Sequence, residues 1–392
     1  MIDRMQLGLV PAKPHIVHEV EGKLTYEECF TRQGFDGAYS ILYHRAPPTR
    51  GQAPRPSQRG WGAPVAASID LLARRHFVTP RLPAGGQLLD ARVPLLTNAD
   101  VTLLVSRPTE SDDAYLANGD GDELHFIHEG RGHVDSMFGR LAFTKGDYVC
   151  LPRSTIHRWH FDEPGFVFTI EGHGFIDVPK QFRNGSGQLK MDAPYSHRDF
   201  VRPEWPNGGL AGATENGPRT LVVKKGGRFH EYRLDHNPLD VVGWDGVVWP
   251  FAFAIEKYQP KTGLVHLPPT IHTTFAGNRF IVCSFVPRVT DTHEQAIPCP
   301  YPHSSVDCDE VIFYVRGHFT SRRGIGAASV SLHPAGVVHG PHPGAYEGSI
   351  GSKRTDELAV MLDTFTPLQI TAAALTLEDA DYLASWQSRE TP

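Results

Sequence analysis

The chain is poor in cysteine, and its few cysteines form no recognisable pattern. There are five, an odd number, scattered over 392 residues without a Cys-x-x-Cys pair. Disulfide frameworks come from even sets of cysteines in secreted chains, and redox or metal sites commonly use paired ones. The pattern therefore favours reduced thiols and a cytoplasmic protein.

Long apolar runs and blocks of positive charge are also missing. No stretch of about 18 uninterrupted apolar residues occurs, and acidic and polar residues follow Met1 where a signal peptide would be apolar. The net charge is −6, and no run of about five basic residues interrupts it. Such a chain lacks the electrostatic footprint of a nucleic-acid surface. We expect no membrane partner and no nucleic-acid partner.

Glycine and proline, in contrast, are plentiful. The chain holds 38 glycines and 32 prolines, which many turns between short strands explain better than long helices do. Its length allows two domains or one large duplicated β unit. Composition therefore favours a mainly β protein.

Two parts of the chain share one spacing of charged, turn and imidazole residues. In each, a carboxylate stands seven residues before a glycine, and a proline stands five residues before a histidine. The repeat has a period of about 185 residues and is clearer in spacing than in identity. It predicts a bicupin, which consists of two jelly-roll-like β barrels. The repeated residues are Glu123, Gly130, Pro152 and His157 in the first copy and Glu310, Gly317, Pro334 and His339 in the second.

The second copy carries a candidate metal site made of His303, Glu310 and His339. Two imidazoles and one carboxylate on one face of an octahedron leave three positions open, as in non-haem Fe(II) enzymes that activate O2. The alternatives are a surface strand carboxylate for Glu310 and a plain loop residue for His303. Cys308 lies in the same segment, but O2-activating sites usually exclude thiolate, so we do not expect it to bind metal.

The first copy lacks a histidine at the position that matches His303. We therefore predict that this barrel has lost its metal and serves as scaffold. Its four histidines make a rival site conceivable, although a barrel histidine more commonly satisfies polar needs inside or at the rim of the barrel. These are His125, His128, His133 and His157.

Two residue types near the second copy could act on a substrate. His272 precedes an apolar strand and can reach the cavity, where an imidazole with an ordinary pKa of about 6.5 would take a phenol proton; a polar-loop histidine is the alternative. Arg288, Arg322 and Arg323 are candidates for binding a substrate carboxylate, because a guanidinium pairs with one through two hydrogen bonds. The spacing does not choose among the three.

Two further histidines flank the candidate ligand His339. His333 precedes the turn and is expected to orient a ligand or the substrate. His342 follows in a rigid His-Gly-Pro-His-Pro loop, where it either contacts the substrate or holds the turn.

We divide the chain into three parts. Residues 1–175 form an N-terminal arm, irregular to about residue 60, and a metal-free cupin-like barrel. Residues 176–240 form an excursion between the barrels. Residues 241–392 form the catalytic cupin barrel and a terminal helix, the best helical stretch being 369–386.

At these residues the chain resembles the homogentisate 1,2-dioxygenase family, in particular its shorter bacterial branch. The likeness is strong over the C-terminal 140 residues or so and looser elsewhere. It rests on the residues 259–272, 280–288, 296–311, 331–347 and 357–365, with a further familiar run at 43–49.

The resemblance implies a two-domain cupin-like fold with one Fe(II) held by His303, Glu310 and His339, and with His272 at the family's proton acceptor. It implies cleavage of the ring of 2,5-dihydroxyphenylacetate by O2 to give maleylacetoacetate, in tyrosine and phenylalanine breakdown. The expected partners are thus a small aromatic dihydroxy acid and O2, and the family leads us to expect a homo-oligomer.

Two departures from the animal enzymes leave the substrate open. One extra residue lies between His303 and Glu310, and Phe319 stands where a substrate-contacting tyrosine is expected. Losing that hydroxyl removes a hydrogen bond worth about 1 kcal/mol. The alternatives are a dioxygenase of gentisate or another hydroquinone, a metal-dependent cupin isomerase or hydrolase using Zn or Mn, and a non-enzymatic cupin that stores or senses a ligand.

Overall fold

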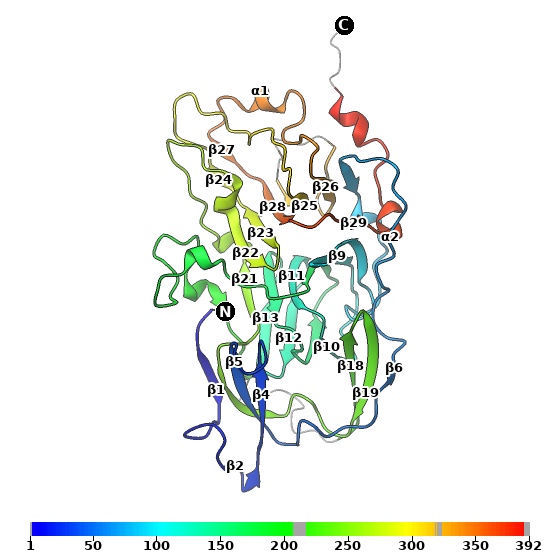
Figure 1. The fold of residues 1–392 in the computed structure, drawn as a ribbon, viewed down its shortest axis with the longest axis vertical. Coiled ribbons are helices and arrows are strands. Elements are labelled where there is room, and N and C mark those ends of the chain that lie inside the picture. Colours follow the sequence, from blue (N-terminus) through cyan, green and yellow to red (C-terminus); the bar gives the residue numbers. More distant parts are fainter. Residues whose placement is uncertain (1, 207–216, 318, 320–323, 388–392) are drawn as a thin grey trace.

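The computed structural model describes residues 2–206, 217–317, 319 and 324–387. They form a mainly β protein of two jelly-roll-like barrels, as the bicupin prediction requires. Figure 1 shows the second barrel, in yellow and orange, above the first, in cyan and green. Among the described residues, no helix has the length and apolar character needed to cross a membrane.

The first barrel is built from two large, mostly antiparallel sheets. One has the order β17 (Phe200–Val201), β21 (Phe251–Ala254), β14 (Asp147–Leu151), β11 (Asp122–Glu129), β16 (Phe166–Gly172), β9 (Val101–Ser106), β8 (Val93–Thr97) and β29 (Gln369–Ile370). The other has the order β13 (Gly139–Phe143), β12 (Gly132–Ser136), β15 (His157–Phe161), β10 (Tyr115–Asn118), β18 (Arg219–Lys225), β19 (Arg228–Leu234) and β6 (Arg55–Pro56).

The second barrel has one six-stranded sheet and a short strand pair. The sheet runs β22 (Thr273–Gly277), β23 (Phe280–Phe285), β28 (Leu358–Thr364), β25 (Asp309–Arg316), β26 (Val330–His333) and β7 (Arg75–Phe77); the pair is β24 (Arg288–Val289) and β27 (Arg354–Thr355). The edge strands β7 and β29 each belong to the sheet of the other half of the chain. This exchange ties the two barrels together.

The N-terminal arm is more regular than its composition predicts. Three of its strands build a four-stranded sheet with β20, in the order β1 (Met5–Gly8), β20 (Val241–Gly246), β5 (Tyr39–His44) and β4 (Tyr26–Thr31), and β2 (Glu19–Val20) and β3 (Lys23–Leu24) form a hairpin. Two of these strands pair with β20, about 200 residues away in sequence. The excursion 176–240 likewise supplies β18 and β19 to the first barrel.

The helices are short. The expected C-terminal helix consists of a single α-helical turn followed by a 3-10 turn, because strand β29 and the buried Ala374 hold the chain against the first barrel. The helical elements are α1 (Ala345–Ser349), α2 (Ala372–Leu375), and the 3-10 turns η1 (Thr79–Arg81), η2 (Lys180–Phe182), η3 (His197–Asp199), η5 (Ile255–Lys257), η6 (Pro269–His272) and η7 (Leu383–Trp386).

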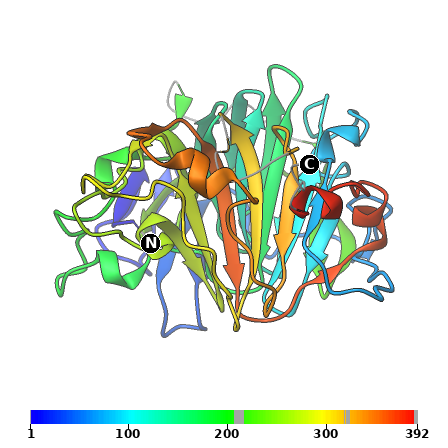
Figure 2. The same cartoon turned by 90° about the horizontal axis from the view of Figure 1, so that it is seen from above.

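The two barrels share a continuous aromatic core. Phe168 of the first barrel stacks on Phe313 of the second, with ring centroids 4.8 Å apart, and Phe126 approaches the same ring at 6.0 Å. All three side chains are buried, and burial of each such ring contributes about 2–3 kcal/mol. Figure 2 shows the central strands of the two halves side by side.

In each barrel, an equivalent buried aspartate holds the same turn through hydrogen bonds to the backbone. Asp122 begins β11 and Asp309 begins β25, so the two occupy equivalent positions. Each accepts one backbone N–H from the residue after the repeated proline and one from a later loop. The donors are Arg153 at 2.8 Å and Ile176 at 3.0 Å for Asp122, and Ala335 at 2.7 Å and Leu368 at 2.7 Å for Asp309.

The core also holds histidines that are neutral in the folded protein. His128 lies edge-on to Phe166 and Phe313, with centroids 5.3 and 5.5 Å away, and its burial lowers its pKa to about 4. Burial likewise lowers the pKa of His157 to about 4 and that of His272 to about 3. All three values lie below the ordinary 6.5 of the unfolded chain.

We therefore expect each of these histidines to lower the free energy of unfolding as the pH drops below about 6.5, whereas buried carboxyls with a raised pKa, such as Asp363 at about 7, act in the opposite direction. For each such histidine, the unfolded chain binds a proton that the folded protein does not bind until about pH 4, at a cost of about 1.4 kcal/mol per pH unit. Urea unfolding of the protein and of His128→Phe between pH 7.5 and 5 isolates the contribution of His128, and the two slopes should differ by up to one proton. An identical slope in that variant would contradict the assignment of His128.

Candidate metal centre and its cavity

Three side chains from separate parts of the second barrel converge at one end of it. Glu310 is the second residue of β25, whereas His303 and His339 lie in loops that pair through two backbone hydrogen bonds, His303 N–H to His339 O at 2.8 Å and the reverse at 2.9 Å. Each imidazole Nε2 lies 3.7 Å from Glu310 Oε2. The three donor atoms lie within 4.8 Å of one another.

The orientation of both imidazoles is set by the backbone. Nδ1 of His303 donates to the carbonyl of Tyr301 at 2.8 Å, and Nδ1 of His339 donates to that of Val337 at 2.8 Å. A carbonyl only accepts, so the proton is on Nδ1 and the lone pair on Nε2 points at the carboxylate. This is the tautomer that a metal ion requires.

The carboxylate is held ionised. Burial alone would raise the pKa of Glu310, but the neighbouring imidazoles of His303, His333 and His339 keep it well below its usual range. Nε2 of His339 is buried and has no hydrogen-bond partner among the described residues. An ionised carboxylate and two imidazoles whose Nε2 atoms face it fit a divalent metal, and the donor set suits Fe(II).

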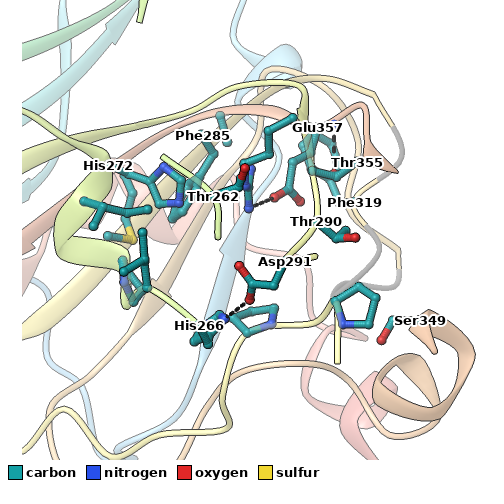
Figure 3. Close-up of a pocket in the computed structure, with 18 of the residues that line it drawn as sticks. Thr262, His266, His272, Phe285, Thr290, Asp291, Phe319, Ser349, Thr355 and Glu357 are labelled. Atoms are coloured by element: carbon teal, nitrogen blue, oxygen red, sulfur yellow. Dashed lines mark hydrogen bonds and ion pairs between the residues drawn. The ribbon is translucent and has the colours of Figure 1, made fainter. Parts of the chain in front are cut away.

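A cavity of about 120 Å³ opens beside this cluster. Aromatic and aliphatic side chains line part of it, and about as many polar or charged side chains line the rest. Figure 3 shows His272 and Phe285 on one side of it and Glu357, Thr355 and Phe319 on another. The lining includes Phe285, Ile312, Tyr314, Phe319, Ala359 and Met361, with His272, Arg288, His303, Glu310 and Glu357 as polar or charged groups.

His272 lines this cavity from the end of η6. Its ring is 4.9 Å from that of Phe285, and only 5% of the residue is exposed. Burial, with a contribution from the positive charge of Arg288, lowers its pKa to about 3, not the 6.5 assumed from sequence. The imidazole is therefore neutral over the whole physiological range and weakly basic until an anion enters the cavity.

Arg288 and Phe319 also lie in the cavity wall. Arg288 Nη2 donates to Glu357 Oε1 at 3.2 Å, and its guanidinium lies 5.7 Å from the centre of the Phe285 ring. Phe319 packs edge-on against Tyr314, with centroids 4.7 Å apart. The other two arginine candidates, residues 322 and 323, lie outside the described residues.

His333 and His342 are not part of the cavity lining. His333 Nδ1 lies 2.6 Å from Glu310 Oε1, a contact that orients the carboxylate. His342 stacks on Trp386 at 3.8 Å and contacts Ser385 Oγ at 3.0 Å, so it holds the C-terminal segment on the barrel. Both histidines therefore contact protein groups beside the cavity, and their roles in substrate binding stay predictions.

Sequence reasoning missed an acidic neighbour of the centre. Asp363 on β28 stands opposite Glu310 in the strand register, and burial together with the charge of Glu310 raises its pKa to about 7. It also missed the pair of His266 with Asp291, 2.6 Å apart at the cavity (Figure 3). Both contacts depend on chain pairing over long separations, and no local pattern marks them.

The four histidines that made a rival site in the first barrel conceivable do not form one compact group among the described residues. Among the described residues, the compact donor group there is His133, Asp135 and His160, on the neighbouring strands β12 and β15. Guanidinium groups already engage it. Arg140 binds both carboxylate oxygens of Asp135 at 2.7 and 3.0 Å, and Arg158 Nε donates to His160 Nε2 at 3.2 Å.

Comparison with known proteins decides the family. The model described as homogentisate 1,2-dioxygenase N-terminal matches residues 96–255, and the model described as homogentisate 1,2-dioxygenase C-terminal matches residues 253–391. The chain belongs to the homogentisate 1,2-dioxygenase family. It is a dioxygenase, and the resemblance seen in its sequence is confirmed.

Two relatives agree in sequence with this membership, and one solved structure shows a weaker likeness. A "Putative dioxygenase" of Saccharolobus solfataricus is 38% identical over 384 residues, 97% of both chains. The homogentisate 1,2-dioxygenase of Rhodopseudomonas palustris strain BisB5 is 26% identical over 297 residues, which are 71% of this chain but 64% of that enzyme. Among solved structures, a cupin 2 conserved barrel domain protein of Leptotrichia buccalis covers 77% of this chain and 100% of its own at 9% identity and a TM-score of 0.35.

Proposed function

We propose that this member of the family is an Fe(II)-dependent enzyme that cleaves the ring of homogentisate, 2,5-dihydroxyphenylacetate, with O2 to give maleylacetoacetate. The observation that carries the proposal is the cluster of His303, Glu310 and His339 at the edge of an aromatic-walled cavity. Iron held there would leave coordination positions open for a phenolate and O2 and would pass electron density from the electron-rich ring to O2.

The surrounding residues have complementary tasks. Phe285 and Phe319 form flat apolar walls for an aromatic ring and exclude water from it. His272 is neutral and accepts the phenol proton at a ring nitrogen. The negative substrate raises the basicity of this imidazole when it binds, because an adjacent anion stabilises the imidazolium.

Of the three arginines considered from the sequence, Arg288 is the one that the structure describes, and we assign it to the substrate carboxylate. Its guanidinium donates a hydrogen bond to Glu357 in the free protein, and its other N–H groups can donate to the carboxylate of a substrate. We expect Arg288→Gln to raise KM for homogentisate by about ten- to a hundredfold, the loss of one charge-assisted interaction. Plain hydroquinone, which lacks the carboxylate, is the control substrate, and an equal rise in its KM would contradict this role.

The test of the function is O2 uptake by protein loaded anaerobically with Fe(II). The substrates compared are homogentisate, gentisate and hydroquinone. Uptake with homogentisate alone, with an absorbing diketo-acid product, is the expected result. Iron binding without uptake for any of the three would overturn the proposal.

A second candidate is cleavage of gentisate or another hydroquinone. Phe319 favours it, because a phenylalanine cannot supply the hydroxyl hydrogen bond expected from a tyrosine at this position. The same O2-uptake assay separates the candidates by substrate. Cytoplasmic location and assembly into a homo-oligomer, like the three-part division of the chain, stay predictions.

A further inference from the structure

The first barrel retains two residues of the second barrel's cluster. Glu123 is the second residue of β11, as Glu310 is of β25. Nδ1 of His157 donates to the carbonyl two residues earlier, Thr155, at 2.9 Å, which repeats the anchoring of His339. The first barrel thus has an equivalent carboxylate and one imidazole that is oriented in the same way.

An arginine pairs with the carboxylate of this site. The side chain of Arg92 is completely buried; Nη1 pairs with Glu123, and Nε donates to the carbonyl of Leu88 at 3.2 Å. Its guanidinium lies 4.3 Å from the centre of the Trp61 ring, which closes one side. A guanidinium buried this deeply is tolerated only when an opposite charge pairs with it. Its partner Glu123 is likewise buried, with 1% of the residue exposed.

Several polar atoms around the guanidinium have no hydrogen-bond partner among the described residues. They are Glu123 Oε2, His125 Nε2, His157 Nε2 and Arg92 Nη2, all buried. Glu123 Oε2 and His125 Nε2 lie 3.6 Å apart. One carboxylate and two imidazoles with free nitrogens are the donor types of a transition-metal site, although with Arg92 in place their donor atoms do not all lie within 4.8 Å of one another as those of the second barrel do.

The neighbouring charges are also paired without a metal. Asn118 Nδ2 bridges Glu123 at 3.2 Å and Glu171 at 2.9 Å, and Lys224 pairs with Glu171 and lies 3.6 Å from Asp120. Arg92 and Lys224 thus provide counter-charges for Glu123 and Glu171. Adding a divalent ion while Arg92 is present would place two extra charges beside a buried cation.

We propose that the guanidinium of Arg92 takes the place of a metal ion in the first barrel. It supplies the positive charge that Glu123 requires and keeps divalent cations out. Without this guanidinium, Glu123, His125 and His157 become a second divalent-metal site. The inference concerns a site separate from that of the proposed function and does not depend on it.

The test is Co(II) binding in a background in which the second-barrel cluster is disabled by His339→Ala. The single variant is expected to bind no Co(II) tightly, and Arg92→Ala/His339→Ala is expected to bind one equivalent, with the visible absorption bands of a nitrogen- and oxygen-bound ion. The triple variant that adds His157→Ala should lose that equivalent. No binding by the double variant, or one equivalent bound through His157 with Arg92 present, would overturn the proposal.

A second measurement keeps the proposal testable if Arg92→Ala fails to fold. Arg92→Met and Glu123→Gln should each lower Tm, because each leaves one buried charge without its partner. The double variant Arg92→Met/Glu123→Gln removes both charges and should recover most of the loss. Strictly additive decreases in Tm would show that Arg92 does not serve as the counter-charge of Glu123 and would overturn the proposal.

Discussion

Replacement of His339 by alanine is expected to abolish both iron binding and O2 uptake while the barrel stays folded. The side chain offers a buried Nε2 whose direction is fixed by the hydrogen bond from Nδ1 to Val337. Its loss leaves one imidazole and Glu310, which hold a metal only weakly. Disturbing even an outer hydrogen bond of a metal site costs about 10–100-fold in affinity, so a lost ligand costs at least that much.

Metal content per chain and initial O2 uptake, measured on the same preparation, check this expectation. His293→Ala is the matched control, since His293 is an exposed histidine of the same barrel. It should bind iron as the unaltered protein does. Full activity in His339→Ala would remove this residue from the cluster and with it the proposed centre.

Replacement of His272 by alanine should leave iron binding intact and reduce turnover by about 10²–10⁴-fold, the usual contribution of a positioned base. The residue is not among the three donors at the centre, yet it lines the same cavity. With a pKa of about 3 it is neutral in the free enzyme from acid to alkaline pH. Protonation of His272 therefore should not lower kcat/KM anywhere between about pH 5 and 8.

Iron stoichiometry, kcat at neutral pH and the pH profile of kcat/KM together check this role. His293→Ala again serves as control. Turnover that survives in His272→Ala would dismiss the residue as base. An acid limb near pH 6.5 that disappears in the same variant would show that the imidazole is less buried in solution than in this structure.

The internal repeat and the candidate cluster could be predicted because both are local patterns. A strand that begins with a carboxylate and a tight turn that ends in a histidine are encoded by neighbouring residues, Glu310 to Gly317 and Pro334 to His339. The packing of Asp309 against the turn after Pro334 then brings the two blocks together. The duplicated spacing also predicted a first barrel built in the same way.

Other features could not be predicted, because they depend on residues far apart in sequence. The N-terminal strands form only by pairing with β20, and the 369–386 helix is interrupted because β29 joins the first barrel's sheet. The low pKa of His272 comes from burial, and the residues that bury it lie in other parts of the chain. The sequence left His342 open between a substrate contact and a structural turn, because its stacking on Trp386 depends on the distant C-terminal segment.

The sequence by itself thus determined the fold class, the duplication and the three residues of the candidate centre, since strand and turn patterns are short-range. Only the tertiary structure decided which charges meet. In the folded chain Asp363 lies opposite Glu310 in the strand register, and Arg92 pairs with Glu123, which is 31 residues away in sequence. Burial and pairing of charges are properties of the packed molecule, because solvent is excluded and partners are juxtaposed only after the sheets have closed.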